Sequence, residues 1–308
     1  MVKNPSIESA SHLKVRDLIA ASAVSQLALR RARERTIEFF LFLAAVSSIA
    51  ITVGIVGILV YESKEFFEHV SIIDFLTDTQ WTVLFADPHY GIMPLVTGTI
   101  VTSTVALLVA LPLGTTIAIY LSEYANDKVR EILKPLLELL SAVPTVVFGY
   151  FALLFVTPLL QHLFPDLPGF NMLSAGIVIG IMIIPYVSSL SEDAIKAVPV
   201  HIREGSYAMG ATRFQTALRV LVPSAFSGIA SAYVLGFSRA VGETMIVAIA
   251  AGQQPNLTLN PMEPAATITT YIVQVSLGDL PHGTVAYQSI FAAGLTLMLM
   301  TLAFNIGG

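Results

Sequence analysis

Residues 204–223 read EGSYAMGATRFQTALRVLVP, a pattern typical of two short helices separated by a tight turn. Glu204 is expected to begin the first helix, because a carboxylate is favourable near the positive end of a helix dipole. Gly210 permits a turn with positive φ, an amphipathic segment follows, and Pro223 starts a long apolar stretch. The pattern predicts a helix–turn–helix lever that projects from a membrane and that another protein can grip.

Apolar stretches dominate the chain on both sides of this loop. Hydrophobic residues make up 55% of the 308 residues and charged residues only 12%, against about 25% charged in a typical soluble domain. The sequence therefore predicts an all-α integral membrane protein with six transmembrane helices. Prolines are expected to break or tilt the third and fifth of them. The six spans lie at about 37–61, 95–120, 136–161, 171–190, 219–251 and 285–306.

Basic residues gather on one side of this six-span topology. Fourteen Lys and Arg lie in residues 1–36, 121–135 and 191–219, whereas the opposite side holds Lys64 and nine acidic residues. Because basic loops stay in the cytoplasm, both termini are predicted to be cytoplasmic. The acidic outer side would repel a free anion, so an anionic substrate would need a carrier. Alternatively, the acidic outer side reflects only the general charge bias of membrane topology and says nothing about the substrate.

The chain is expected to consist of a cytoplasmic segment, residues 1–36, and a transmembrane domain, residues 37–308, which includes the 191–219 loop. Residues 14–35 have apolar positions at helical spacing with basic residues at both ends, which predicts a helix at the membrane interface. The segment runs into arginines rather than a small-residue cleavage site, so it is not a signal peptide. Because Gly308 follows the sixth span directly, we expect further residues beyond it.

The last outer loop, residues 252–284, opens with the turn-forming sequence QQPN. Residues 265–277 then predict a short amphipathic helix. Such a helix is either a gate or docking element at the membrane surface or part of a packed cap.

Two ionisable residues lie inside the fifth predicted span. Residues 236–245 read GFSRAVGETM, with Arg239 and Glu243 four residues apart. A charge near the middle of a membrane costs at least about 2.5–3.5 kcal/mol, so such residues usually face protein and mark a substrate path. A stripe of small residues on the same predicted helix suits close helix packing: Gly228, Ala232, Gly236 and Ala240.

The spacing of these two residues predicts an ion pair on a protein-facing side of the helix. Arg239 offers a planar fork of donors that matches an oxyanion, and Glu243 is expected to hold and compensate it. Ser238 and Thr244 are predicted to lie beside them in the substrate path. A purely structural interhelical ion pair is the alternative.

The 204–223 stretch resembles the cytoplasmic loop of ABC importer permeases, whose motif is E-A-A-x3-G-x9-I-x-L-P. Glu204, Gly210 and Pro223 keep this spacing. The departure is Gly205-Ser206 in place of Ala-Ala, which lowers helix propensity. The resemblance implies that a separate ATPase docks on Glu204, Gly205, Ser206, Tyr207 and Gly210.

The stretch around Arg239 resembles the phosphate-specific (Pst) ABC importer permeases, which carry S-R-A-[IV]-G-E-T here. The residues that follow favour the PstC type over the PstA type. Residues 98–125 resemble the second span and its exit, and residues 141–150 resemble the P-[ST]-V-V-[YF]-G element. The resemblance covers about residues 36–306 and implies the type I ABC importer permease fold with a cytoplasmic coupling helix.

This resemblance implies a chain that forms half of the path of an ATP-driven phosphate importer in a bacterial inner membrane. The implied partners are a PstA-type permease as heterodimer, a PstB-type ATPase dimer and a PstS-type extracytoplasmic phosphate-binding protein, with no nucleic acid. The sequence has no Gly-Lys dipeptide and so no Walker A loop. We therefore expect no enzyme activity and no cofactor in this chain, with ATP and Mg bound by the ATPase. With no cysteine and no ligand spacing among the histidines, no metal site is predicted.

Three other functions remain open at this point. The same kind of permease could carry another oxyanion, such as sulfate or molybdate. A proton-coupled secondary transporter would use Arg239 and Glu243 as a relay but would leave the 204–223 lever without a role. A signalling or scaffold subunit that reports phosphate status is the third. A requirement for ATP hydrolysis separates the first from the other two.

Overall fold

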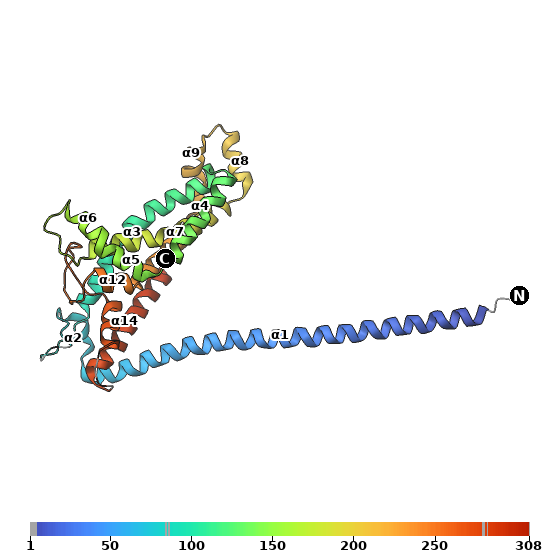
Figure 1. The fold of residues 1–308 in the computed structure, drawn as a ribbon, viewed down its shortest axis with the longest axis horizontal. Coiled ribbons are helices and arrows are strands. Elements are labelled where there is room, and N and C mark those ends of the chain that lie inside the picture. The colour runs from blue at the N-terminus through green and yellow to red at the C-terminus, as the bar shows by residue number, and fades with distance from the viewer. Residues whose placement is uncertain (1–4, 84, 86, 279–280, 282, 308) are drawn as a thin grey trace. The chain divides into compact units, whose positions relative to one another are not determined.

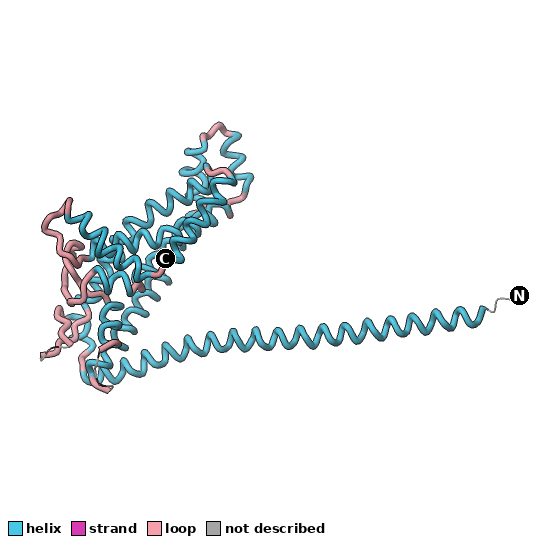
Figure 2. Tube along the Cα trace, viewed as in Figure 1, coloured by secondary structure: helices cyan, strands magenta, loops and turns pink. Residues whose placement is uncertain are grey.

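Helices joined by loops make up the computed structural model, which describes residues 5–83, 85, 87–278, 281 and 283–307 (Figures 1 and 2). Within these residues there is no strand, only an isolated bridge between Trp81 and Tyr90. The α-helices are α1 (Pro5–His69), α2 (Ile72–Thr77), α3 (Met93–Ile119), α4 (Asp127–Ala142), α5 (Thr145–Phe151), α6 (Thr157–Gln161), α7 (Met172–Lys196), α8 (Val200–Ala208), α9 (Arg213–Thr216), α10 (Val222–Ser224), α11 (Phe226–Val241), α12 (Met245–Ala250), α13 (Ile268–Ser276) and α14 (Val285–Gly307). Three π-helical segments lie between them: η1 (Tyr120–Tyr124), η2 (Ala152–Val156) and η3 (Ala217–Leu221).

In the described part of the chain, four helical stretches are long and apolar enough to cross a membrane: Arg33–His69, Met93–Tyr124, Met172–Lys196 and Val285–Gly307. Two bent pairs account for the remaining predicted spans. Asp127–Ala142 and Thr145–Gln161 meet at 87°, and Arg213–Ser224 and Phe226–Val241 meet at 73°. The first break lies at Pro144 and the second at Ala225, two residues after Pro223, so both predicted breaks lie close to a proline. By length and composition, the described residues thus contain four straight candidate spans, or six if each bent pair is one span.

Helix α7 is the most deeply buried of the straight spans, because 67% of its most apolar 18-residue stretch is covered by protein. A glycine on α7 lets α3 come very close, because a Cβ on Gly180 would lie 2.6 Å from the carbonyl oxygen of Ala106. Helix α11 packs on α7 through the small-residue stripe, where a Cβ on Gly236 would lie 3.1 Å from Cγ2 of Val187. The predicted close packing of this stripe is confirmed.

An aromatic cluster joins the loop before α3 to α13 on the predicted outer side. The rings of Trp81 and Tyr271 meet edge to face at 4.9 Å, and Phe66 and Phe75 do so at 5.7 Å. Such pairs contribute about 0.5–1.5 kcal/mol beyond their buried area. The cluster therefore holds the loop against the helices.

The same loop carries an ion pair. Nδ1 of His89 lies 2.9 Å from Oδ2 of Asp78. The hydrogen bond from this imidazole lowers the pKa of Asp78, and the carboxylate raises the pKa of His89. The pair is strongest when both groups are charged.

The helix predicted at residues 265–277 is α13, and most of its first half is buried. The segment before it packs directly on α3, because a Cβ on Gly98 would lie 2.4 Å from the carbonyl oxygen of Ala266. Oγ1 of Thr99 accepts a hydrogen bond from the backbone N–H of Ile268 at 3.1 Å. Of the two alternatives, the packed cap describes this segment.

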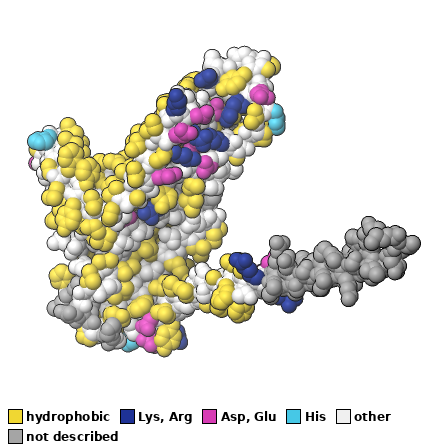
Figure 3. Space-filling view, turned by 45° about the vertical axis from the view of Figure 1, so that its right-hand side comes forward, with side chains coloured by type: hydrophobic (Ala, Val, Ile, Leu, Met, Phe, Trp, Pro, Cys, Tyr) yellow, Lys and Arg dark blue, Asp and Glu magenta, His cyan; other side chains and the backbone are white. Residues whose placement is uncertain are grey.

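The chain divides into two compact units, Met1–Ile58 and Leu59–Gly308. The helix predicted at residues 14–35 is helical as part of α1, although side chains up to residue 32 lie outside the described part of the structure. Its place at the membrane interface and the boundary after residue 36 stay predictions. Figure 3 shows hydrophobic side chains over much of the visible face of the second unit, with charged ones gathered toward the end that carries α8 and α9.

Candidate functional site

The lever predicted from residues 204–223 has the expected turn. Helix α8 ends at Ala208 and α9 begins at Arg213, and Gly210 between them has φ +83°. Thr212 caps α9 by accepting a hydrogen bond from Gln215 N, while the Gln215 side chain accepts one from Thr212 N. Gly210 is thus required by the backbone, because other residues rarely adopt this φ.

The predicted start of the first helix is wrong. Helix α8 begins at Val200, directly after Pro199, and Ile202 N already bonds the carbonyl oxygen of Pro199 at 3.1 Å. Glu204 therefore lies in the middle of α8, where the dipole gives its carboxylate no particular advantage. The proline, rather than the acidic residue, marks the helix boundary.

Most of the predicted coupling residues lie on the surface of this loop. Glu204, Gly205, Tyr207 and Gly210 are exposed. Ser206 is half-buried, and its Oγ lies 2.9 Å from Oγ1 of Thr216, so it ties α8 to the end of α9. An alanine at this position would not make that hydrogen bond.

Sequence reasoning missed two large apolar side chains on the same surface. Met209 is 88% exposed and Phe214 63% exposed. They lie on either side of the Gly210 turn and add apolar area to the exposed coupling residues. Their position next to the positive-φ glycine is the signal that could have singled them out.

The base of the loop is braced by charged side chains. Arg203 of α8 pairs with Glu123 of η1 at 2.8 Å, which connects α8 to the end of the second span. Nearby, the fully buried carboxylate of Glu192 on α7 is surrounded by three cations. These form the Glu192 cluster: Arg130 Nε at 2.9 Å, Lys134 Nζ at 3.2 Å and Lys196 Nζ.

The Glu192 cluster was not predicted. Its sequence signal is two pairs at i,i+4 spacing, Arg130 with Lys134 on α4 and Glu192 with Lys196 on α7. What the sequence does not show is that α4 packs on α7 at this level. A buried carboxylate with three cations joins the two helices where the first bent pair begins.

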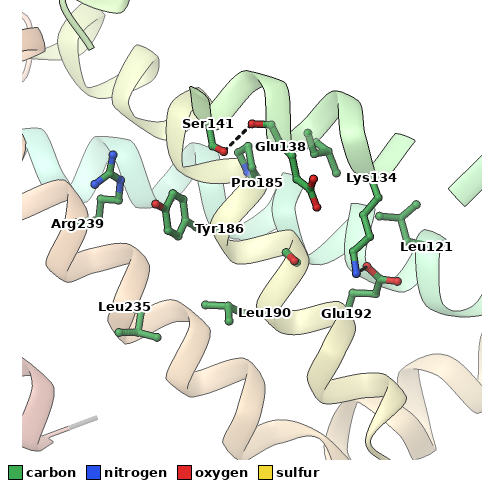
Figure 4. Close-up of a pocket in the computed structure, with 12 residues that line it drawn as sticks. Leu121, Lys134, Glu138, Ser141, Pro185, Tyr186, Leu190, Glu192, Leu235 and Arg239 are labelled. Carbon is green, nitrogen blue, oxygen red and sulfur yellow. Dashed lines mark hydrogen bonds and ion pairs between the residues drawn. The ribbon is translucent and has the colours of Figure 1, made fainter. Parts of the chain in front are cut away.

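A groove of about 420 Å³ runs between α4, α7 and α11. Leucine side chains form much of its wall, and Ser141 and Ser189 also line it. Figure 4 shows Arg239 beside Tyr186 at one end of the groove and Lys134 beside Glu192 at the other. The groove therefore has the arginine at one end, a lysine paired with a glutamate at the other and mainly apolar walls between them, with Glu138 also in its lining.

Arg239 is exposed in the groove and is held by an aromatic ring. Its Cζ lies 5.0 Å from the centroid of the Tyr186 ring, within the distance of a cation–π interaction. The residue is exposed within this chain, so the prediction that it faces protein rather than lipid stays a prediction. An exposed arginine on an apolar span requires water, an anion or a second protein next to it.

The predicted ion pair between Arg239 and Glu243 is wrong. Among the interactions of the described residues, Arg239 has no carboxylate partner. Helix α11 ends at Val241, so the i,i+4 spacing no longer brings the two side chains to one face. Oε1 of Glu243 accepts hydrogen bonds from the backbone N–H groups of Met245 at 3.1 Å and, more weakly, Ile246 at 3.5 Å.

The other predicted path residues do not line the groove. Ser238 Oγ accepts a hydrogen bond from Asn305 of α14 at 3.0 Å, and Thr244 bonds the carbonyl oxygen of Gly242 at 3.3 Å. Glu243 is buried at the break between α11 and α12, where its carbonyl oxygen accepts from Thr269 of α13 at 2.8 Å. Of the four candidates, Arg239 alone reaches the groove, and the path role of all four stays a prediction.

No cluster of three potential metal ligands occurs within the described residues. The ionisable groups at the groove are arginine, lysine and glutamate side chains.

The family model described as binding-protein-dependent transport system inner membrane component matches residues 110–307. The probable ABC transporter permease protein YqgH of Bacillus subtilis is 36% identical over 264 residues, which covers 86% of this chain and 84% of the relative. The phosphate transport system permease protein PstC 1 of Mycobacterium bovis is 33% identical over 241 residues, which covers 71% of each.

The fold is also found in a solved transporter. A chain of the bacterial alginate ABC transporter, in complex with an alginate pentasaccharide-bound periplasmic protein, has a TM-score of 0.61 at 18% identity. The match covers 89% of this chain and 94% of that chain. At this identity the likeness shows the fold alone.

Proposed function

Because this chain belongs to the family of binding-protein-dependent transport system inner membrane components and is similar to PstC-type permeases, we propose that it is a subunit of an ATP-driven phosphate importer. It is a multi-pass membrane protein with the ABC importer permease fold. Members of this family are the membrane component through which the solute passes, not catalytic subunits. The chain supplies half of the translocation path.

The single observation that carries the phosphate proposal is the exposed Arg239 in the apolar groove, within a sequence similar to phosphate permeases. Its guanidinium can donate two parallel hydrogen bonds to an oxyanion. The low dielectric of the groove walls strengthens that attraction relative to water. Free of any carboxylate partner among the described residues, the arginine keeps its charge available.

We propose that the 204–210 surface docks on a separate ATPase. Its exposed residues, the neighbouring Met209 and Phe214, and the Gly210 turn form a rigid projecting contact. The absence of a Gly-Lys dipeptide supports ATP and Mg being held by that PstB-type partner dimer. Movement of α8 would reach the spans through the Arg203–Glu123 pair.

Two further partners complete the proposed assembly. A PstA-type permease would supply the other half of the path and cover the exposed Arg239 side of the groove. A PstS-type receptor would deliver phosphate to the acidic outer side, which carries one lysine against nine acids. Basic loops favour cytoplasmic termini in a bacterial inner membrane.

A second candidate is a permease for another oxyanion. The relative at 36% identity bears a general name, ABC transporter permease protein, that specifies no substrate. A guanidinium fork binds sulfate or molybdate by the same geometry. Selectivity would then rest on the receptor.

The test is uptake by the complete transporter in sealed vesicles with internal ATP. The proposal predicts phosphate uptake that requires both the receptor and hydrolysable ATP. Sulfate and molybdate, each offered with the same receptor, should not accumulate. Uptake that continues without ATP, driven by a proton gradient, would reject the importer assignment.

A further inference from the structure

The Tyr186 ring is the strongest feature of the groove that the sequence did not bring to attention. It lies on α7, directly after Pro185, and its face covers the Arg239 guanidinium at 5.0 Å. We propose that Tyr186 is a positioning residue for the anion path: its ring holds Arg239 so that the N–H edge faces the groove. This inference rests on the proposed function.

The ring itself is placed by tight packing of the helix beneath it. Ile183 and Val187, on either side of Tyr186 along α7, are fully buried. Both contact α11 at Gly236, where a Cβ would lie 3.3 Å from Cγ2 of Ile183 and 3.1 Å from Cγ2 of Val187. Arg239 follows Gly236 by one helical turn on α11. The two helices therefore bring ring and guanidinium together without a flexible segment between them.

A ring face is a different kind of partner from a carboxylate. A carboxylate binds the N–H edge of a guanidinium, the same edge that an oxyanion needs. An aromatic ring interacts with the flat face and leaves the edge donors free. The carboxylate of Glu243, which the sequence suggested as the partner, is occupied by Met245 N and Ile246 N. Arg239 is thus oriented while none of the carboxylates in the described part of the chain is paired with its donor edge.

The groove favours this arrangement. Arg239 and Tyr186 are both exposed, so an anion in the groove can reach the guanidinium edge. Leu190 and Leu235 line the groove nearby and keep the dielectric low. Once the proposed partner permease covers this side of the groove, the pair is desolvated and the cation–π attraction is worth more than at an open surface.

The experiment uses the complete transporter in vesicles and measures ATP-driven uptake of radiolabelled phosphate with the receptor saturated. Tyr186→Phe keeps the ring face and should retain uptake within about twofold of wild type. Tyr186→Leu removes it and should lower uptake by about 3- to 30-fold. Tyr61→Leu, an exposed tyrosine far along the chain on α1, is the matched control and should have no effect.

A fluorinated series separates the ring electrostatics from its shape. Phenylalanine with increasing numbers of ring fluorines at position 186 keeps the volume but weakens the negative ring face. Uptake should fall stepwise along this series, while assembly of the complex and its ATP hydrolysis stay unchanged. Because all members of the series pack alike, misfolding does not produce such a gradient.

Arg239→Ala in the same assay separates the role of Tyr186 from the role of Arg239 in phosphate uptake. Loss of uptake with Arg239→Ala, together with a flat fluorinated series or normal Tyr186→Leu uptake, would overturn the positioning role and leave the proposed function standing. Normal uptake with Arg239→Ala would overturn the arginine's place in the path and this inference with it. Loss in Tyr186→Phe equal to that in Tyr186→Leu would assign the effect to the hydroxyl and also reject the inference.

Discussion

The loop of residues 204–223 and the segment of residues 236–245 were both predicted from short motifs, but only the first has its predicted central feature, the turn at Gly210. In the loop, Gly210 adopts the positive φ that its position in the motif requires. In the segment, Arg239 and Glu243 do not pair, because the helix ends between them. The backbone conformation of one turn depends on adjacent residues alone, so a short motif predicts it well. A motif that pairs two side chains also requires that the helix continue.

Loss of Glu192 is the largest expected effect, because this fully buried carboxylate compensates three cations. Glu192→Gln leaves three cations around a buried neutral group and should lower the free energy of unfolding by roughly 3 kcal/mol. We expect a clear fall in the melting temperature of the purified assembly. Asp193→Asn is the control, because Asp193 is 63% exposed and its pair with Lys134 is worth less than about 1 kcal/mol. Equal falls in melting temperature for the two variants would contradict a stabilising role of the buried Glu192 cluster.

Gly210→Val tests the region where the sequence prediction succeeded. A side chain at φ +83° costs about 1–2 kcal/mol, and more for a β-branched residue. The turn should distort and uptake should fall by about tenfold or more, with ATP hydrolysis less affected.

The matched control for this variant is Gly283→Val. Gly283 has φ +82° and open space around it, as Gly210 does, but lies on the predicted outer side. It carries the same backbone strain away from the ATPase. If Gly283→Val uncoupled hydrolysis from uptake as strongly as Gly210→Val, the lever would lose its special role.

A double-mutant cycle tests the region where the prediction failed. Glu243→Ala removes the acceptor for Met245 N and Ile246 N and should cost about 1–2 kcal/mol of stability. Since Glu243 and Arg239 form no pair, the effects of Glu243→Ala and Arg239→Ala should add within about 0.5 kcal/mol. Glu243→Gln keeps an acceptor oxygen and should be the milder change. A double variant more stable than either single variant would restore the ion pair.

The smallest expected effect is the pH dependence of the outer loop. The raised pKa of His89 adds stability that is complete below about pH 6.5 and is lost as pH rises through its folded pKa. The lowered pKa of Asp78 adds stability that is present above about pH 4 and is lost as pH falls. The difference in melting temperature between wild type and Asp78→Asn should therefore be greatest between these values. A difference that does not change with pH would mean that the pair contributes nothing.

Much of the fold follows from local sequence signals. Apolar length predicts the spans, and Pro144 and Pro223 predict the two breaks. The small-residue stripe of α11 predicts its contact with α7. Each of these features depends on residues that are neighbours in the chain or in one helix.

The site was less predictable because it is assembled from distant segments. Tyr186 of α7 meets Arg239 of α11 only after α7 packs against the stripe. Glu192 meets Arg130 only after α4 packs on α7. The spacing of residues in the sequence therefore does not predict these contacts. The start of α8 at Val200 was missed for a different reason, because Pro199 outweighs the preference of Glu204 for a helix N-terminus.

The central claim is that Arg239 binds the anion as it passes through the groove. The Arg239→Lys variant tests this claim most directly. Lysine keeps the charge but loses the planar fork and its bidentate hydrogen bonds. In vesicles with ATP and saturated receptor, the account predicts that phosphate uptake falls by about tenfold or more while assembly and basal ATP hydrolysis persist. Phosphate uptake at the wild-type rate by Arg239→Lys would contradict the claim.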